Sequence, residues 1–225
     1  MADINLSIPN GKVTAIVGAS GSGKTTLVKL LLGFYEPMSG SIRVGDTLLS
    51  EFNLGWWRSQ CGAVMQEGYL FSDTIARNIA ISDDEPDIER IRQAARVANI
   101  ADYIEALPLG YNTMIGQDGQ GISQGQRQRI LIARVVYKNP MFVFLDEATN
   151  ALDANNERAI TENLAEFYKG KTVVVVAHRL STVRDADQIV VLDAGKIVEV
   201  GTHEELTAKR GKYFALVKNQ LELGN

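Results

Sequence analysis

Residues 18–25 read Gly-Ala-Ser-Gly-Ser-Gly-Lys-Thr, and the apolar run Val-Thr-Ala-Ile-Val at residues 13–17 stands directly before them. The run predicts a buried strand, and the spaced leucines that follow the loop predict a helix. A Gly-x-x-x-x-Gly-Lys-Thr pattern between a strand and a helix is typical of a phosphate-binding loop. The glycines let backbone N–H groups converge on phosphate oxygens, and the helix adds the positive end of its dipole.

The polar side chains of this loop each have an expected part in holding a nucleoside triphosphate with Mg²⁺. We expect Lys24 to reach the β- and γ-phosphates and the Thr25 hydroxyl to ligate Mg²⁺. Thr26 is expected to contact the α-phosphate. The predicted phosphate-contacting residues are Gly18, Ala19, Ser20, Gly21, Ser22, Gly23, Lys24, Thr25 and Thr26. The alternative, a glycine-rich turn with a chance lysine, leaves the complete match of the pattern unexplained.

A second apolar run, residues 142–145, ends in the carboxylates Asp146 and Glu147. In phosphate-loop enzymes a carboxylate at a strand end holds Mg²⁺ directly or through water, which is the part expected of Asp146. Glu147 stands where it could orient and polarise an attacking water. The alternative is a strand followed by a solvated acidic turn, and the phosphate loop in the same chain argues against it.

The alternation of strand-like and helix-like stretches predicts an α/β sheet core interrupted by a mostly helical lobe. We expect strands at residues 4–8, 12–18, 41–44, 62–65, 141–145, 172–176, 188–192 and 196–200. Helices are expected after the phosphate loop and at residues 154–168, 180–184 and 213–221. The later strands are β-branched runs with almost no polar interruption, as in a sheet covered on both faces.

Composition excludes several classes of protein. The chain has 225 residues, a net charge of −4 and 45% hydrophobic residues, an ordinary globular mix that gives no reason to expect nucleic-acid binding. Its one cysteine, Cys61, cannot form an internal disulfide, which favours a cytosolic setting. No apolar run approaches the roughly 18–20 residues that span a bilayer, and the start lacks a signal-peptide pattern.

Four further motifs carry a resemblance to a known family. Residues 122–126, Ile-Ser-Gln-Gly-Gln, resemble the Leu-Ser-Gly-Gly-Gln signature of ATP-binding cassette (ABC) ATPases. Gln66 resembles the glutamine of the family's Q-loop, residues 150–153 resemble its D-loop, and His178 resembles its switch histidine. With the phosphate loop and the acidic strand end, six motifs follow the family order over essentially the whole chain. The sequence is therefore similar to the nucleotide-binding domain of ABC transporters.

The resemblance implies a fold and a partner. It implies a P-loop NTPase (RecA-like) sheet core over residues 1–225 as a single domain, with a helical subdomain inserted at about residues 74–138 and a small antiparallel β part. It also implies that two copies pair head to tail, with ATP between the phosphate loop of one copy and the signature of the other.

The same resemblance implies site residues and cofactors. His178 would contact the γ-phosphate, and Gln66 would sense Mg²⁺ and water. Ser123, Gly125 and Gln126 would face the ATP of the partner copy. The implied catalytic residues are Glu147, His178, Lys24 and Gln66; the metal residues are Thr25, Gln66 and Asp146; Asp153 joins the nucleotide-binding set. The implied cofactors are ATP and Mg²⁺.

Three features depart from the family pattern. Gln124 stands at a signature position that is usually glycine, and Asn150 replaces the usual serine of the D-loop. The family has an earlier strand and an aromatic residue that stacks on adenine, and nothing before Asp3 supplies either, so we expect the first strand to be truncated. Phe34 and Tyr35 are poor substitutes. Loss of one stacked base would weaken nucleotide binding by about 1–3 kcal/mol.

Softer features indicate which transporter class the chain resembles. Residues 70–79, 113–119 and 201–206 look like those of exporters with a fused membrane domain, with Gln117 where glutamate is usual. The whole is most similar to bacterial exporters of peptides or bacteriocins, including those with an N-terminal peptidase. The resemblance implies a domain at the cytoplasmic face of the inner membrane that powers export, with a transmembrane domain as partner, no nucleic acid, and a soluble isolated fragment.

Three other readings remain open at this point. One is a soluble ABC ATPase of translation or DNA repair, although such proteins usually carry two domains or a long coiled coil. Another is a regulatory module that binds nucleotide without hydrolysis, against which Glu147 and His178 argue. A P-loop kinase or GTPase would leave the signature unexplained.

Overall fold

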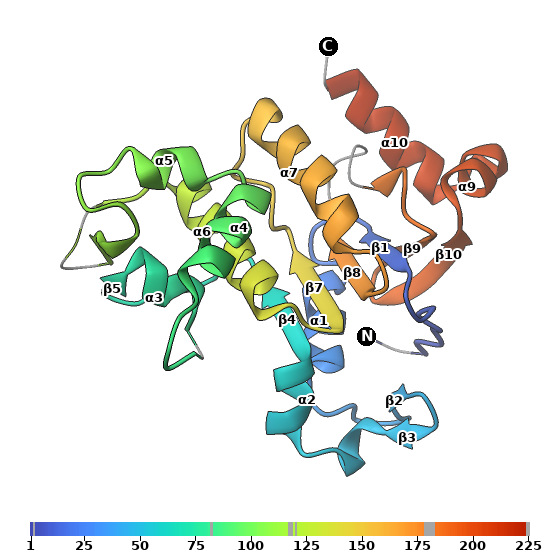
Figure 1. Cartoon of the computed structure of the whole chain (residues 1–225). Helices are drawn as coiled ribbons and strands as arrows, with labels where there is room; N and C mark the ends of the chain where they lie inside the picture. The colour runs from blue at the N-terminus through green and yellow to red at the C-terminus, as the bar shows by residue number, and fades with distance from the viewer. Residues whose placement is uncertain (2, 82, 117–118, 120, 178–182, 224–225) are drawn as a thin grey trace. The chain divides into compact units, whose positions relative to one another are not determined.

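The computed structural model describes the chain except residues 2, 82, 117–118, 120, 178–182 and 224–225 (Figure 1). The chain forms two compact units. The first comprises Met1–Cys61, Met141–Asp146 and Gly170–Asn225, and the second comprises Gly62–Pro140 and Glu147–Lys169.

The first unit is built on a mostly parallel sheet. Its strands are β1 (Val13–Val17), β7 (Phe142–Asp146), β8 (Thr172–Val176), β9 (Gln188–Asp193) and β10 (Lys196–Gly201). They lie in the order β10-β9-β1-β8-β7, and only β10 is antiparallel to its neighbour. Every residue of β8 is buried, as expected for a central strand covered on both faces. A mixed α/β fold with a parallel sheet core confirms the predicted fold class.

One predicted strand is absent, and one strand that is present is less buried than expected. Residues 4–8 alternate in exposure but form no strand. The next strand in the sequence, β1, is already paired with β8 on one side and β9 on the other. Residues 4–8 therefore cannot pair beside β1. The β-branched run at residues 196–200 predicts a strand covered on both faces. The side chains of β10 instead alternate between exposed and half-buried, because β10 is the antiparallel strand at the end of the order.

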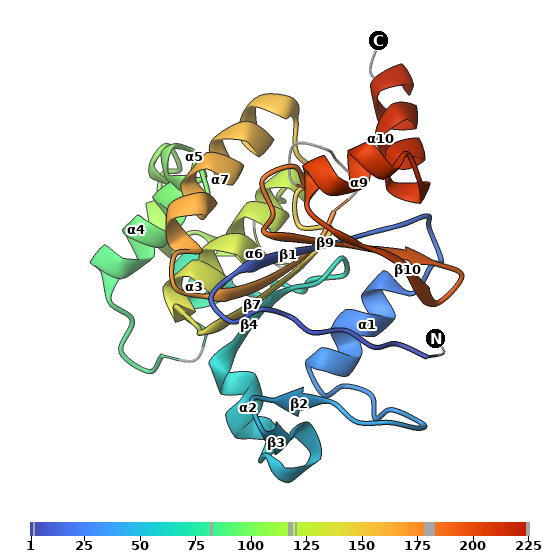
Figure 2. The same ribbon diagram turned by 90° about the vertical axis from the view of Figure 1, so that its right-hand side faces the viewer.

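Helices flank this sheet. α1 (Lys24–Leu31) packs against β7 and β8, whereas α9 (His203–Lys209) and α10 (Lys212–Leu223) pack against β10. Figure 2 shows α1 and the α9–α10 pair on opposite sides of the sheet. α9 begins with a capping box between Thr202 and Glu205. Smaller elements complete the unit: β2 (Arg43–Val44), β3 (Thr47–Leu48), the 3-10 helix η1 (Leu49–Glu51) and α2 (Leu54–Gln60).

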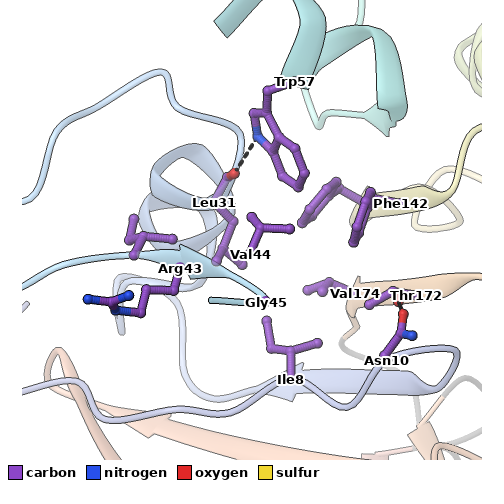
Figure 3. A pocket seen from close by; sticks show the side chains of 12 residues that line it. Ile8, Asn10, Leu31, Arg43, Val44, Gly45, Trp57, Phe142, Thr172 and Val174 are labelled. Atoms are coloured by element: carbon purple, nitrogen blue, oxygen red, sulfur yellow. Dashed lines mark hydrogen bonds between the residues drawn. The ribbon is translucent and has the colours of Figure 1, made fainter. Parts of the chain in front are cut away.

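A cavity of about 460 Å³ lies in the first unit beside the sheet (Figure 3). Apolar side chains form most of its wall, including Ile8, Trp57, Phe142 and Val174. Trp57 Nε1 donates to the Leu31 carbonyl at 3.0 Å, which satisfies the indole N–H. The extended segment at residues 4–8 thus contributes Ile8 to a cavity wall and no strand to the sheet.

The second unit is mainly helical. Its elements are β4 (Cys61–Val64), which leads into it, β5 (Asp73–Thr74), α3 (Ile75–Ile79), α4 (Ile88–Val97), α5 (Ala101–Glu105), the 3-10 helix η2 (Gly110–Asn112), β6 (Met114–Ile115), α6 (Gln124–Lys138) and α7 (Ala154–Phe167). α6 is central, since α3 and α4 both pack on it. The predicted helical character of residues 74–138 is confirmed, with β5 and β6 pairing as a two-residue antiparallel ribbon.

Candidate nucleotide-binding site

The carboxyl edge of the sheet brings two of the predicted motifs together. Val176 of β8 pairs with Ile16 of β1 on one side and with Asp146 of β7 on the other. The phosphate loop that follows β1 and the acidic end of β7 therefore leave the sheet at the same edge, two strand spacings apart. That separation is about 10 Å between backbones, which side chains and a triphosphate can bridge.

The phosphate loop depends on glycine for two different reasons. Gly18, Gly21 and Gly23 have φ values of 152°, 77° and 105°, where other residues are strained. A Cβ on Gly18 would lie 2.1 Å from the Leu192 carbonyl oxygen, so this glycine allows the chain to pass against β9. Gly21 has no neighbouring atom within 4 Å of such a Cβ. Only the backbone angle demands glycine there, and the space beside it is open.

Lys24 is held inside the loop. Its Nζ donates to the carbonyls of Gly18 and Ala19 at 2.9 and 3.0 Å, and the residue is only 5% exposed. The loop carbonyls thus hold the ammonium group between β1 and α1. A phosphate oxygen is a stronger acceptor for an ammonium than a neutral carbonyl, so the same position suits a lysine that exchanges partners when an anion binds.

The start of α1 fits an anion. Its N-cap, Gly23, supplies no side-chain hydrogen bond to the first turn. Ser22 Oγ is buried and has no hydrogen-bond partner among the described residues. Uncapped backbone N–H groups and an unsatisfied hydroxyl beside an eight-residue helix are the groups that phosphate oxygens satisfy.

The oxygen ligands that Mg²⁺ prefers are present at this edge of the sheet. Thr25 is half-buried in the first turn of α1, and Asp146, fully buried, is the last residue of β7. A hydroxyl and a carboxylate are hard oxygen donors, and Mg²⁺ is commonly held by one or two such groups together with substrate phosphates. These residues therefore fit the predicted cation.

Glu147, the next residue, lies in the second unit and has a strained backbone. Its φ is 56°, in the left-handed region that glutamate rarely adopts. Asn150 restrains the side chain, because its Nδ2 donates to Glu147 Oε2 at 2.7 Å. The backbone N–H of Asn150 also donates to the Glu147 carbonyl at 3.2 Å. Strain maintained by surrounding bonds is a common mark of functional residues.

The signature residues form the start of α6. Ser123 is the N-cap, its side chain accepts from the Gln126 N–H, and the Gln126 side chain accepts from the Ser123 N–H at 2.8 Å. Gln124 is the first helical residue, and its side chain is exposed. Gln124 is absent from the residues with positive φ, so the change from glycine strains nothing. Gly125 lies close to the turn after β7, since a Cβ there would lie 3.1 Å from the Ala151 carbonyl oxygen, a tight contact.

A buried glutamine that the sequence analysis missed joins α6 to the turn after β7. Gln128 Nε2 donates to the Glu147 carbonyl at 3.3 Å, and Gln128 Oε1 accepts from the Ala151 N–H at 3.1 Å. A glutamine among arginines at a helix start looks like a solvated face. Gln128 follows Gly125 by about one helical turn and so lies on the same face of α6, which packs against residues 147–151. Only this position could have indicated its burial.

The remaining predicted residues are placed as follows. Gln66 is exposed in the turn after β4. Asp153 caps α7 by accepting from the N–H groups of Asn155 and Asn156, and the hydrogen bonds from Asn156 lower the pKa of its carboxyl. His178 lies outside the described residues, as do residues 180–182 of the helix predicted at 180–184.

The chain belongs to the ABC transporter family, whose sequence model matches residues 1–150. Within that family it is an ATPase domain of the exporter-related kind. It is 49% identical, over 98% of its length and 38% of the relative's, to the ATP-dependent lipid A-core flippase of Alkalilimnicola ehrlichii. It is 48% identical, over 97% of its length and 31% of the relative's, to mouse ATP-binding cassette sub-family B member 10, mitochondrial.

A solved structure gives the same assignment. A bacterial Atm1-family ABC exporter with ATP bound superposes with a TM-score of 0.90 at 39% identity, over 94% of this chain and 37% of the exporter. The chain thus spans well under half the length of these relatives. Across the part of the chain that the structure describes, no helix combines the length and apolar character needed to cross a membrane.

Proposed function

We propose that this chain is the part of a membrane exporter that binds and hydrolyses ATP to drive transport, acting as a head-to-tail pair of two copies. The observation that carries the proposal is the shared carboxyl edge of β1, β8 and β7, where the phosphate loop and Asp146 emerge on either side of β8. The similarity to an exporter with ATP bound supports it.

The nucleotide would be held by the phosphate loop. The backbone N–H groups of residues 18–25 and the N-terminus of α1 would bind the phosphates, and Ser22 would donate its unpaired hydroxyl. Lys24 would move from the loop carbonyls to the β- and γ-phosphates. Thr25 and Asp146, with Gln66, would hold Mg²⁺, which supplies charge neutralisation on the phosphate oxygens when bound.

The chemical step would be attack of water on the γ-phosphate. Glu147 would accept a hydrogen bond from that water and orient it in line with the breaking bond, and Asn150 would hold the carboxylate in place. His178 would contact the γ-phosphate. Ser123, Gly125 and Gln126 of the partner copy would offer hydrogen-bond donors to the same phosphate from the start of their α6, and Asp153 would contribute from the D-loop.

The setting and the cargo are also part of the proposal. A transmembrane domain, fused in a longer protein, would place this domain on the cytoplasmic side of a membrane. The peptide or bacteriocin cargo expected from the sequence stays a prediction. One relative is named as a lipid A-core flippase, so the two cargo classes need to be compared in transport assays of the whole protein.

The deciding experiment is the ATPase rate as a function of protein concentration, for this chain and for Glu147→Gln. A composite site predicts a rate that rises faster than linearly with concentration and falls at least about a hundredfold in the variant, while ATP binding persists. A rate that is linear in concentration would overturn the paired site. Nucleotide binding with no hydrolysis in either protein would leave a binding-only module.

A further inference from the structure

Gln128 is a polar side chain in the second unit that is only 8% exposed. The two hydrogen bonds described above both join its amide to backbone atoms. Both of its amide atoms bind backbone groups of one short turn, residues 147–151. Its Nε2 donates to the Glu147 carbonyl at 3.3 Å, and its Oε1 accepts from the Ala151 N–H at 3.1 Å.

The two partners fix the orientation of this amide. A carbonyl only accepts and a backbone N–H only donates. A flipped amide would therefore place Oε1 against the Glu147 carbonyl oxygen and Nε2 against the Ala151 N–H, and both hydrogen bonds would be lost. Burying an amide is unfavourable unless it is hydrogen-bonded. Gln128 is therefore held in one position, and it holds the turn in return.

The same helix contacts the turn at a second point. The Ala151 carbonyl lies against Gly125, where an added Cβ would stand only 3.1 Å from its oxygen. Gln128 thus holds the peptide that carries the Ala151 N–H, and Gly125 lies close to the carbonyl of the next peptide. The start of α6 therefore contacts residues 147–151 through Gln128 and through Gly125.

The other end of the turn carries Glu147, whose φ of 56° is maintained by neighbouring bonds. Its carbonyl accepts from Gln128 and from the Asn150 N–H, and its carboxylate accepts from the Asn150 side chain. A change at Gln128 therefore alters the peptide that sets the direction of the Glu147 side chain.

We propose that Gln128 is a positioning residue that makes Glu147 at one nucleotide site respond to occupation of the other. The inference rests on the proposed function, in which Ser123 and Gly125 face the ATP bound by the partner copy. Gln128 lies about one turn further along the same helix, and Glu147 acts on the chain's own ATP. Binding of ATP at the partner's site would fix the position of the start of α6. Gln128 would then fix the position of residues 147–151, and with it the direction of the Glu147 carboxylate.

Two substitutions separate the bonds of Gln128. Gln128→Glu keeps an acceptor for the Ala151 N–H but loses the donor to the Glu147 carbonyl. Gln128→Met has a similar length and loses both bonds without adding charge. Gln93→Met, on the exposed side of α4 in the same unit, is the matched control for replacing a helical glutamine.

The measurements are the ATP dependence of the hydrolysis rate and, separately, the affinity of dilute protein for ATP. We expect both Gln128 variants to lower kcat about tenfold and to reduce the Hill coefficient from about 2 towards about 1. The affinity of the dilute protein for ATP should change less than about twofold, and Gln93→Met should match the wild type in all three. Thermal unfolding of each variant establishes that it is folded, and Gln128→Glu serves if Gln128→Met does not fold.

The outcomes are distinguishable. A wild-type chain with no cooperative ATP dependence would overturn the proposed paired function and this inference with it. Cooperative wild-type hydrolysis with an unchanged Hill coefficient in both Gln128 variants would overturn the inference alone. A parallel loss of kcat and ATP affinity would assign Gln128 a purely structural role and would also overturn it.

Discussion

Asn150 Nδ2 donates a hydrogen bond of 2.7 Å to Glu147 Oε2, so a residue three positions along the chain fixes the carboxylate that we propose as the water-orienting group. This bond links two observations that were separate in the sequence, the glutamate after the acidic strand and the asparagine that departs from the usual D-loop serine.

Loss of that bond should slow hydrolysis without weakening nucleotide binding. We expect Asn150→Ala to lower kcat about three- to tenfold, since a hydrogen bond to a charged group in a partly exposed position contributes modestly. Asn150→Ser should recover part of the rate if its shorter hydroxyl reaches the carboxylate. Steady-state kinetics separate the cases, and an Asn150→Ala variant with normal kcat would show that Glu147 needs no such restraint.

The two kinds of glycine in the phosphate loop predict two different costs. Gly18→Ala places a Cβ against the Leu192 carbonyl and should destabilise the fold by about 3 kcal/mol or more. Gly21→Ala meets no atom and should cost about 1–2 kcal/mol from its φ of 77° alone. Denaturant unfolding of the two variants provides the comparison, and equal losses would contradict the distinction.

Asp153 gives the fold a pH dependence at low pH. Hydrogen bonds from Asn156 lower the pKa of this carboxyl below its ordinary value. A lowered folded pKa means that the ionised form stabilises the folded state above the ordinary pKa of about 3.9, and this stabilisation is lost as pH falls through the lower folded value. The melting temperature of the wild type should therefore exceed that of Asp153→Asn at about pH 6, and the difference should shrink by about pH 3.

A melting-temperature difference that stays constant across this range would mean that the charge of Asp153 does not contribute to its capping of α7. Asn155→Ala serves as a control, because it leaves the backbone N–H groups that bind Asp153 in place.

The indole of Trp57 predicts a measurable stability effect in the first unit. Its Nε1 donates to the Leu31 carbonyl at 3.0 Å, and its ring packs against Phe142 beside the cavity of Figure 3. Trp57→Phe should cost about 1–3 kcal/mol, from the lost hydrogen bond and the smaller ring. Urea unfolding followed by far-UV circular dichroism would measure it, and a loss near zero would mean that the cavity wall adapts freely.

The sequence predicted what local pattern determines. The run at residues 172–176 is β8 to the residue, and the phosphate loop lies between a strand and a helix as its spacing requires. Residues 4–8 misled the prediction because alternation indicates a strand only where another strand offers a free edge. α2 was missed because the two tryptophans hide a short helix that Asn53 caps.

The site residues also differ in how far local sequence patterns can predict them. Motif spacing predicts Lys24, Asp146 and Glu147 as site residues because their expected chemistry is tied to neighbouring residues in the chain. Gln128 was invisible because its partners, Glu147 and Ala151, are 19 and 23 residues away and are backbone atoms. Every residue has a backbone carbonyl, and nearly every residue a backbone N–H, so no pattern of side chains in the sequence can predict this contact.

The left-handed backbone of Glu147 sets stability and activity against each other at one position. Glycine at residue 147 would relax the φ of 56° and lose the carboxylate. Selection of a random library for thermal resistance alone should therefore enrich glycine there, whereas selection for ATP turnover should retain glutamate. The two enrichment profiles, compared at this one codon, would give a direct reading of how much fold stability the protein gives up for its chemistry.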